Sequence, residues 1–426
     1  MTLQVLSPSL SGTLTVMLFT LIISLRRRIV VSGTPEAYWG WALTALSLLT
    51  VFLISATQAR SLTQLNKNWY TGLITAMALS LVGCFFVDNV LFFYVLFEAS
   101  ALVVFFFILR FGYQPERFTA SAYLLLFTAL SSLPFIFIIL TMGSEFSVLT
   151  FDLIKIRRRF GRSELRGLLI LALTIGFLVK FPIYLFHIWL PKAHVEASRR
   201  GSMLLAGILL KLGAYGVFRL RSILQGGQLI RFIIFFRILG GGLLSAMCCR
   251  FVDFKVLIAY SSVAHMRLVI GGIMSLSKLG RESSLGMSLG HGVISSGLFF
   301  GAGLLYASTN RRLFLFNKRT MNWAPWFTFF WFILCASNMG TPPTFNFWIE
   351  LLLLFTLVSF RWSSVVVLVG SLFFGVVFNV VLYIMAHGAK PSYPSSFYLR
   401  LSLKDLSILM AHIILRIYLI FRFGFK

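Results

Sequence analysis

The sequence predicts an all-α fold, a polytopic transmembrane helical bundle with about 13 spans, and three observations support this class. Hydrophobic residues make up 58% of the 426 residues and charged residues only 12%, whereas soluble domains average about 25% charged residues. The mean hydropathy is +0.91. The apolar residues also fall into segments of about 20 residues, the length that crosses a bilayer as a helix.

These segments follow one another along nearly the whole chain, so little is left for a soluble catalytic domain. The first is followed rather than preceded by the basic residues Arg26–Arg28, so we expect neither a signal peptide nor a transit peptide. The eleventh is long and interrupted. The expected spans are residues 8–25, 38–56, 69–87, 90–111, 119–142, 166–190, 201–221, 229–250, 255–275, 285–307, 323–358, 363–387 and 405–423.

The net charge of +26 reflects a shortage of acids, because 38 basic residues stand against 12 acidic ones. Basic runs such as Arg157–Arg159 and Arg311–Arg312 fall in predicted loops, where they favour contact with anionic lipid head groups and acidic neighbouring chains. Nucleic-acid binding is disfavoured, since no soluble module is left to do it. The basic loops fall on alternate sides of the membrane in similar numbers, so the distribution of basic residues does not predict the orientation of the chain.

Redox and nucleotide sites are not indicated by the sequence. The cysteines Cys84, Cys248, Cys249 and Cys335 contain no C-x-x-C pair and lie in or beside apolar spans, where cysteine behaves as a small hydrophobe. An iron–sulfur cluster needs about four clustered thiolates. Gly240–Gly242 is a glycine run inside a span rather than a strand–turn–helix motif. We therefore expect this chain to bind no cofactor.

Glu98 is the only acid in the apolar segment 90–111. An ionised carboxylate at mid-membrane costs roughly 2.5–3.5 kcal/mol on insertion scales, so we expect Glu98 to be protonated or paired. Lys180 is its expected partner. The alternative is a glutamate that only links helices through hydrogen bonds.

Two later segments each carry a lysine among apolar residues. Lys180 is followed by Phe181 and Pro182, and the proline is expected to disturb the helix beside the charge. His187 comes about two helical turns later, on nearly the same face. Lys211 lies in the next span, where glycines allow close helix contact. Buried lysines, a buried histidine and a broken helix are what a proton path requires.

A metal site is a weaker interpretation of the same stretch. His194 and Glu196 lie in the link between the two spans, near His187. Pro191 breaks the helix between the two histidines, and no third ligand has suitable spacing. We therefore expect no metal.

The pattern restarts after Gly227, which predicts two repeats of five spans each. A proline interrupts a helix in both repeats, at Lys180-Phe181-Pro182 and at Thr341-Pro342-Pro343-Thr344. Corresponding broken spans in two halves are typical of inverted-repeat transporters, whose sites lie near the breaks. The predicted parts are residues 1–68 (N-terminal spans), 69–221 (first repeat), 229–388 (second repeat) and 389–426 (final span and tail).

Two histidines on consecutive spans extend the predicted path into the second repeat. His265 follows Ser261 and Ser262, and His291 lies in the segment SLGHGVISSGLFF. A lone histidine on an apolar face is more often structural, but two with hydroxyls nearby favour a proton relay. Glu350 is the acid that follows the double-proline break.

The stretch from Phe177 to Gly216 resembles a known family. The family patterns K-x-P-x-Y-x-x-H-x-W-L-P-K-A-H-V-E-A and G-S-M-x-L-A-G-I-L-L-K-L-G are both complete here, as are F-Y-x-L-F-E-A and G-Y-Q-P-E-R around and after Glu98. The chain looks very like the chain 4 family of NADH–ubiquinone oxidoreductase, the proton-pumping, antiporter-like membrane-arm subunits of mitochondrial respiratory complex I. The same patterns separate this family from the sister chains 2 and 5.

The resemblance implies two inverted five-helix repeats in the mitochondrial inner membrane, surrounded by lipids and by other membrane-arm subunits, especially the antiporter-like chains 2 and 5. NADH, FMN, iron–sulfur clusters and ubiquinone would belong to other subunits of the complex. In the family the glutamate matching Glu98 pairs with the lysine matching Lys180. His265 and His291 match the central hydrophilic axis, and Glu350 matches the terminal acid through which protons leave.

The predicted function is therefore proton translocation, coupled to electron transfer in other subunits. Burial disfavours the charged form of a lysine and a nearby carboxylate favours it, so making or breaking the Glu98–Lys180 pair would switch the lysine between holding and releasing its proton. The predicted relay comprises Glu98, Lys180, His187, Lys211, His265, His291 and Glu350.

Two alternatives remain open at this point. A subunit of a stand-alone, multi-subunit cation/proton antiporter would share the lysines and the glutamate, and a non-conducting scaffold would only seal the membrane arm. The chain departs from the family pattern at Ala197-Ser198-Arg199-Arg200-Gly201, where the family has A-P-x-x-G-S-M, and at Arg267, where the family usually has a small residue. No role is assigned to these arginines.

Overall fold

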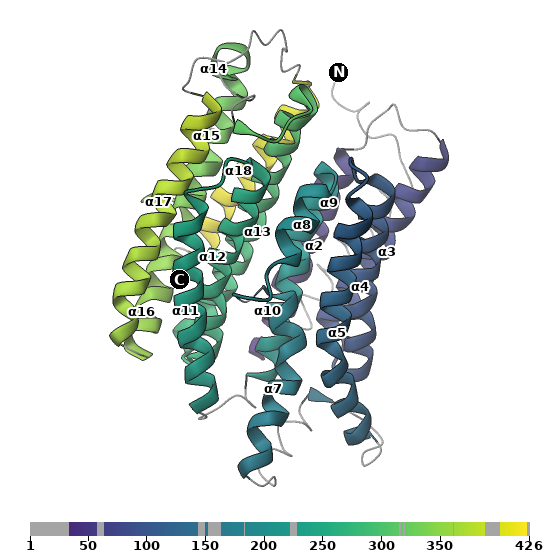
Figure 1. Cartoon of the computed structure of the whole chain (residues 1–426), viewed down its shortest axis with the longest axis vertical. Helices are drawn as coiled ribbons and strands as arrows, with labels where there is room; N and C mark the ends of the chain where they lie inside the picture. Colours follow the sequence, from purple (N-terminus) through teal and green to yellow (C-terminus); the bar gives the residue numbers. More distant parts are fainter. Residues whose placement is uncertain are drawn as a thin grey trace.

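The chain folds into long helices that stand side by side (Figure 1). The structure is a computed structural model, and it describes residues 34–57, 64–143, 150–151, 163–182, 184–221, 228–314, 317, 320–360, 362–387 and 401–423. No strand occurs among these residues, which contain only two isolated β-bridges, Asn89 with Thr150 and Asp253 with Leu313. The predicted all-α class is confirmed.

The helices form two neighbouring bundles, coloured purple to teal and teal to yellow in Figure 1. The helices of the first bundle are α2 (Pro35–Ala56), α3 (Gln64–Phe86), α4 (Val90–Phe111), α5 (Arg117–Gly143), α7 (Ser163–Lys180), α8 (Trp189–Glu196), α9 (Arg199–Leu204), the π-helix η1 (Leu205–Leu209) and α10 (Leu210–Leu220). Those of the second are α11 (Gln228–Cys248), α12 (Phe254–Met274), α13 (Lys278–Thr309), α14 (Thr320–Trp323), α15 (Pro325–Met339), α16 (Phe345–Phe360), α17 (Val365–His387) and α18 (Leu403–Phe423), with a short 3-10 turn at Trp362–Ser364.

Eight helices in the described part of the chain are long and apolar enough to cross a membrane. Three shorter apolar helices accompany them, at Leu171–Lys180, Ile234–Cys248 and Phe345–Ser359. Helices occupy each predicted segment from 38–56 onward. The predicted span at 8–25 lies outside the described residues, so the total of 13 spans stays a prediction.

Side-chain caps explain where several helices begin. The Asn89 side chain accepts a hydrogen bond from the Leu91 backbone amide at 2.9 Å and starts α4. Asp253 caps α12 in the same way. Such caps satisfy backbone donors that have no partner inside the helix. Asn310 ends α13 in the left-handed conformation, a frequent C-terminal signal.

Helix α13 lies at the centre and joins the two bundles. It contacts α12, α16 and α18 on its own side and α2, α9 and η1 across the interface. Its glycines and serines allow these close approaches: a Cβ added at Gly292 would lie 3.2 Å from the carbonyl oxygen of Gly207. Helices α5 and α17, by contrast, leave most of their apolar surface exposed.

Both bundles contain an interrupted helix, as the prolines predict. In the first, α7 ends at Lys180 and α8 begins at Trp189. In the second, α15 ends before Gly340, whose φ of 72° is left-handed, and α16 begins at Phe345. The inverted relationship of residues 69–221 and 229–388 is not tested by these interruptions and stays a prediction.

Candidate functional site: a polar path through the helix bundle

The break after α7 places Lys180 inside the first bundle. Pro182 has no amide hydrogen to continue the helix, and the last regular bond runs from the Phe181 amide to the Phe177 carbonyl at 2.8 Å. Across the break, the Trp189 indole donates to the Val179 carbonyl at 3.1 Å, which holds α8 against the end of α7. Lys180 thus carries its charge at a helix C-terminus, the end that favours a cation.

The Lys180 ammonium is fully buried and lies against α4. It donates to the Phe97 carbonyl at 2.5 Å and sits 3.3 Å from the centroid of the Phe97 ring. Glu98 is the next residue, and its Oε1 atom is buried with no hydrogen-bond partner. The two charges lie within electrostatic reach of each other. The expected ion pair is therefore open in this structure, because the lysine bonds to the helix backbone instead of the carboxylate.

His187 lies within the break, between the two bundles. Its ring stacks on Tyr184 at a centroid distance of 5.8 Å and meets Tyr260 of α12 edge-on at 5.5 Å. The side chain is 8% exposed. His187 therefore contacts both the interrupted segment and α12 of the second bundle.

Lys211 is fully buried at the start of α10, directly after the π-helical turn. Its ammonium donates to the Ala206 carbonyl, which also receives a weak bond of 3.5 Å from the Ser295 hydroxyl of α13. Single π-turns are rare and frequently occur at functional sites. The turn therefore presents Lys211 at the contact between the two bundles.

His291, His265 and Glu350 form a contiguous cluster in the second bundle. The rings of His265 and His291 lie 5.4 Å apart between centroids. Nδ1 of His265 lies 3.0 Å from Oε1 of Glu350, an ion-pair distance, but the two atoms are not aligned for a hydrogen bond, and Oε1 is buried with no hydrogen-bond partner. Both ring nitrogens of His291 are buried with no hydrogen-bond partner. Lys211 lies close enough to His291 for their charges to interact.

The structure thus brings the predicted residues into two groups. The first group is Glu98 and Lys180 in the first bundle. The second group consists of Lys211 together with His291, His265 and Glu350. His187 lies at the interface between the bundles. Which of these residues carry protons is not settled by their positions, so the relay stays a prediction. Among the described residues, no three His, Cys, Asp or Glu side chains are arranged to hold a metal ion.

Three buried polar residues beside this path were not among the predicted relay residues. His194 has both ring nitrogens buried with no hydrogen-bond partner, and it stacks on Phe299 of α13 at 4.3 Å. Lys255 donates to the Val195 and Ala197 carbonyls at 3.0 and 3.1 Å. Asn346 is 1% exposed in α16. The signal for Asn346 was its place four residues before Glu350, which puts both on one helix face.

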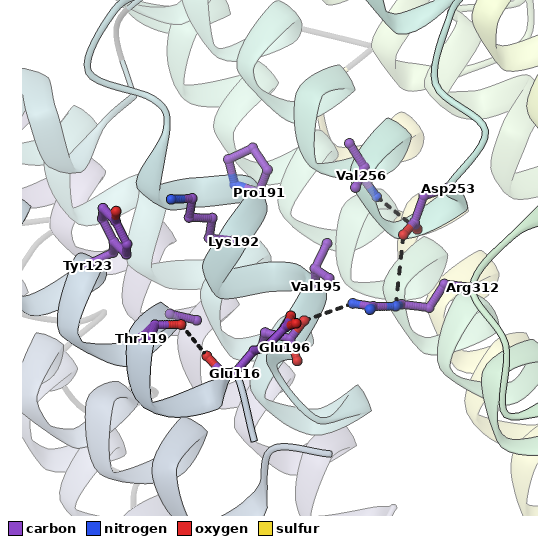
Figure 2. Close-up of a pocket in the computed structure, with 11 residues that line it drawn as sticks. Glu116, Thr119, Tyr123, Pro191, Lys192, Val195, Glu196, Asp253, Val256 and Arg312 are labelled. Carbon is purple, nitrogen blue, oxygen red and sulfur yellow. Dashed lines mark hydrogen bonds and ion pairs between the residues drawn. The ribbon is translucent and has the colours of Figure 1, made fainter. Parts of the chain in front are cut away.

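A pocket of about 330 Å³ opens between the bundles near the ends of α8 and α12 (Figure 2). Figure 2 shows Arg312 reaching between Glu196 and Asp253, with distances of 2.8 and 3.9 Å. The same guanidinium donates to the Gln114 side chain at 2.8 Å. Burial raises the pKa of the Asp253 carboxyl, while the charge of Arg312 opposes that shift. Arg312 was expected to face lipid head groups or acidic chains, but it forms these internal bonds.

Several known proteins are similar to this chain in sequence. Residues 87–375 match the family described as NADH:quinone oxidoreductase/Mrp antiporter, TM. NADH-ubiquinone oxidoreductase chain 4 of Locusta migratoria is 38% identical over 349 residues, covering 81% of this chain and 78% of that protein. Chain 4 of Lumbricus terrestris is 33% identical over 98% of this chain and 93% of its own length. This chain belongs to the NADH-ubiquinone oxidoreductase chain 4 family.

The solved structures agree in fold. A chain of respiratory complex I from Thermus thermophilus superimposes with a TM-score of 0.78 at 22% identity, covering 89% of this chain and 80% of that one. A chain of the Mrp complex from a Dietzia species gives 0.74 at 18% identity, covering 91% of this chain and 48% of that one. Like its relatives, this member of the chain 4 family is a multi-pass protein of the mitochondrial inner membrane.

Proposed function

We propose that this chain translocates protons through a relay of Glu98, Lys180, His187, Lys211, His265, His291 and Glu350. As a chain 4 protein, it is a membrane subunit of a proton-translocating NADH:ubiquinone oxidoreductase. The observation that carries the relay is the continuity of buried titratable groups from Lys211 through the two histidines to Glu350, with ring centroids 5.4 Å apart and an N–O distance of 3.0 Å.

The open state of the first pair supports a switch. Lys180 donates a hydrogen bond to the Phe97 carbonyl rather than to the carboxylate of Glu98, which is the next residue of α4. A small movement of the ammonium from the carbonyl to the carboxylate would close the pair and favour the charged lysine. Electron transfer in other subunits would drive that movement. Buried ionisable groups inside membrane spans are by default candidates for such proton paths.

Partners and cofactors follow from the same proposal. NADH, FMN, the iron–sulfur clusters and ubiquinone would be held by other subunits. Antiporter-like chains 2 and 5, together with lipids, would cover the apolar faces of α5 and α17, which expose residues such as Leu130, Phe137, Val366 and Phe373. The predicted repeats at 69–221 and 229–388 would contribute one broken helix each.

The cation/proton antiporter remains the second candidate because a chain of the Mrp complex shares the fold. The sequence relatives favour the oxidoreductase, since chain 4 proteins match at 33–41% identity over most of this chain. Purification of the native assembly in mild detergent separates the two. A flavin- and iron–sulfur-containing assembly that oxidises NADH supports the oxidoreductase, and a colourless assembly of antiporter subunits contradicts it.

The relay is tested with Lys211→Met in the intact complex reconstituted into vesicles. Methionine approximates the length of the lysine side chain without its charge, so the buried site stays filled. We expect NADH oxidation to persist while fewer protons move per electron. An unchanged proton-to-electron ratio would rule out the relay.

A further inference from the structure

Asn346 is a buried amide that no protein group satisfies. It lies near the start of α16 and is 1% exposed, between the aromatic residues Phe345 and Phe347. Neither its Oδ1 nor its Nδ2 atom has a hydrogen-bond partner. A Cβ added at Gly290 would lie 2.5 Å from Asn346 Oδ1, so the amide lies directly against the bare backbone of α13. A residue that merely stitched α16 to α13 would bond to that helix, and Asn346 does not.

The amide lies beside the end of the proposed relay. Asn346 precedes Glu350 by one helical turn, on the same face of α16. Glu350 contacts His265, and the ring of His265 lies 5.4 Å from that of His291, the residue after Gly290. Helices α12, α13 and α16 pack against one another here. One ring nitrogen of His265 and both of His291 are also buried without a hydrogen-bond partner.

Orphaned polar atoms on three packed helices require a partner. Leaving a buried amide without one destabilises the folded protein. Native proteins almost always satisfy such groups, and ordered water does so where protein atoms do not. The buried atoms without a partner on these helices are those of the Asn346 amide, Nε2 of His265, both ring nitrogens of His291 and Oε1 of Glu350, and buried waters typically bond to two to four such groups.

We infer that Asn346 is a positioning residue that holds ordered water among α12, α13 and α16, linking His291 to the His265–Glu350 pair. The inference rests on the proposed relay and names how its last step is bridged. An amide suits this role because it donates and accepts hydrogen bonds at once yet has no ionisable proton of its own. The water can then take a proton from one neighbour as it releases another to the next, with no net change at Asn346.

The test compares three variants of the intact complex in vesicles. Asn346→Leu keeps the volume but removes both polar atoms, so we expect a loss in protons moved per electron while NADH oxidation continues. Asn346→Ser leaves a hydroxyl and space for water, and we expect it to restore most of the ratio. The matched control is Asn379→Leu. Asn379 is an equally buried amide on α17, but protein groups satisfy it, through bonds of 2.8 Å with Asn338 and the Gly375 carbonyl.

Asn379→Leu is expected to lower thermal stability and to leave the ratio unchanged. A normal ratio in Asn346→Leu overturns the inference, and so does an equal loss in Asn379→Leu. If the Asn346 variants do not assemble, a high-resolution map of the unmodified complex decides. Water density within hydrogen-bond distance of the Asn346 amide supports the inference, and an amide bonded only to protein contradicts it. A normal ratio in Lys211→Met would instead remove the relay itself, whereas a loss in Lys211→Met with normal pumping by Asn346→Leu would remove only the role of Asn346.

Discussion

His265 Nδ1 and Glu350 Oε1 lie 3.0 Å apart, which joins α12 to α16 at the end of the buried polar path. Both side chains come from segments that the sequence marks as apolar, and the two residues are 9% and 5% exposed. Glu350 Oε1 is buried without a hydrogen-bond partner, so the two groups are in contact but not hydrogen-bonded in this structure, and a proton can pass directly between them only when one side chain realigns.

Glu350→Gln is expected to abolish proton transfer at this point while the complex still assembles. Glutamine has nearly the same shape and fills the same site beside His265, but it cannot exchange a proton at neutral pH. The protons moved per electron in vesicles are the measurement. Glu116→Gln, which changes an exposed carboxyl in the loop before α5, is the control and should leave the ratio unchanged.

Gly340→Ala is expected to displace the carboxylate of Glu350. Gly340 has a φ of 72°, and a Cβ there would lie 2.8 Å from Glu350 Oε2. The left-handed conformation alone costs a non-glycine residue about 1–2 kcal/mol, and the carboxylate must also move. We expect lower thermal stability and weaker pumping. Gly370→Ala in α17, where a Cβ would have nothing within 4 Å, should instead be neutral or slightly stabilising.

Arg312→Gln is expected to weaken the junction between the bundles without blocking the relay. Glu196 is 5% exposed and would lose its 2.8 Å bond to the guanidinium, a change that costs about 1–3 kcal/mol for a neutral buried group and more for a charged one. The thermal stability of the complex should fall while protons per electron stay normal. A variant that keeps the stability of the parent complex would show that this ion pair contributes little.

The stability lost in Arg312→Gln should depend on pH. Burial raises the pKa of the Asp253 carboxyl above its unfolded value, and Arg312 opposes the rise. An acid whose folded pKa is raised destabilises the fold at neutral pH, and that destabilisation is relieved as the pH falls through the folded pKa. The loss should therefore be largest near neutral pH and shrink on acidification. A loss that grew at acid pH would contradict this assignment.

Much of the fold could be predicted because membrane-spanning helices are formed by long apolar segments that are visible in the sequence. The segment predicted at 90–111 is α4 with the same bounds, since Asn89 caps its start and Gly112 ends it. Both proline breaks were predicted, because a proline cannot donate the next helical bond. The π-turn before Lys211 was not predicted, and η1 packs there against α13, a segment far away in the sequence.

The candidate site was predicted in its residue types more than in its contacts. Charged or titratable residues in apolar spans stand out in a sequence, which identified Glu98, Lys180 and Glu350. Their bonds could not be predicted, and Lys180 bonds to the Phe97 carbonyl rather than to Glu98. Asn346 was overlooked because a single uncharged amide costs less in a span than a charge, so its importance appears only when its neighbours are known.

The central claim is that protons pass through this chain by way of the Glu98–Lys180 switch. The most direct measurement is the number of protons moved per electron by the intact complex carrying Lys180→Ala or Glu98→Ala, reconstituted into vesicles and supplied with NADH. The account predicts that pumping is lost in both variants while assembly stays largely intact. Normal proton-to-electron ratios in either variant would contradict it.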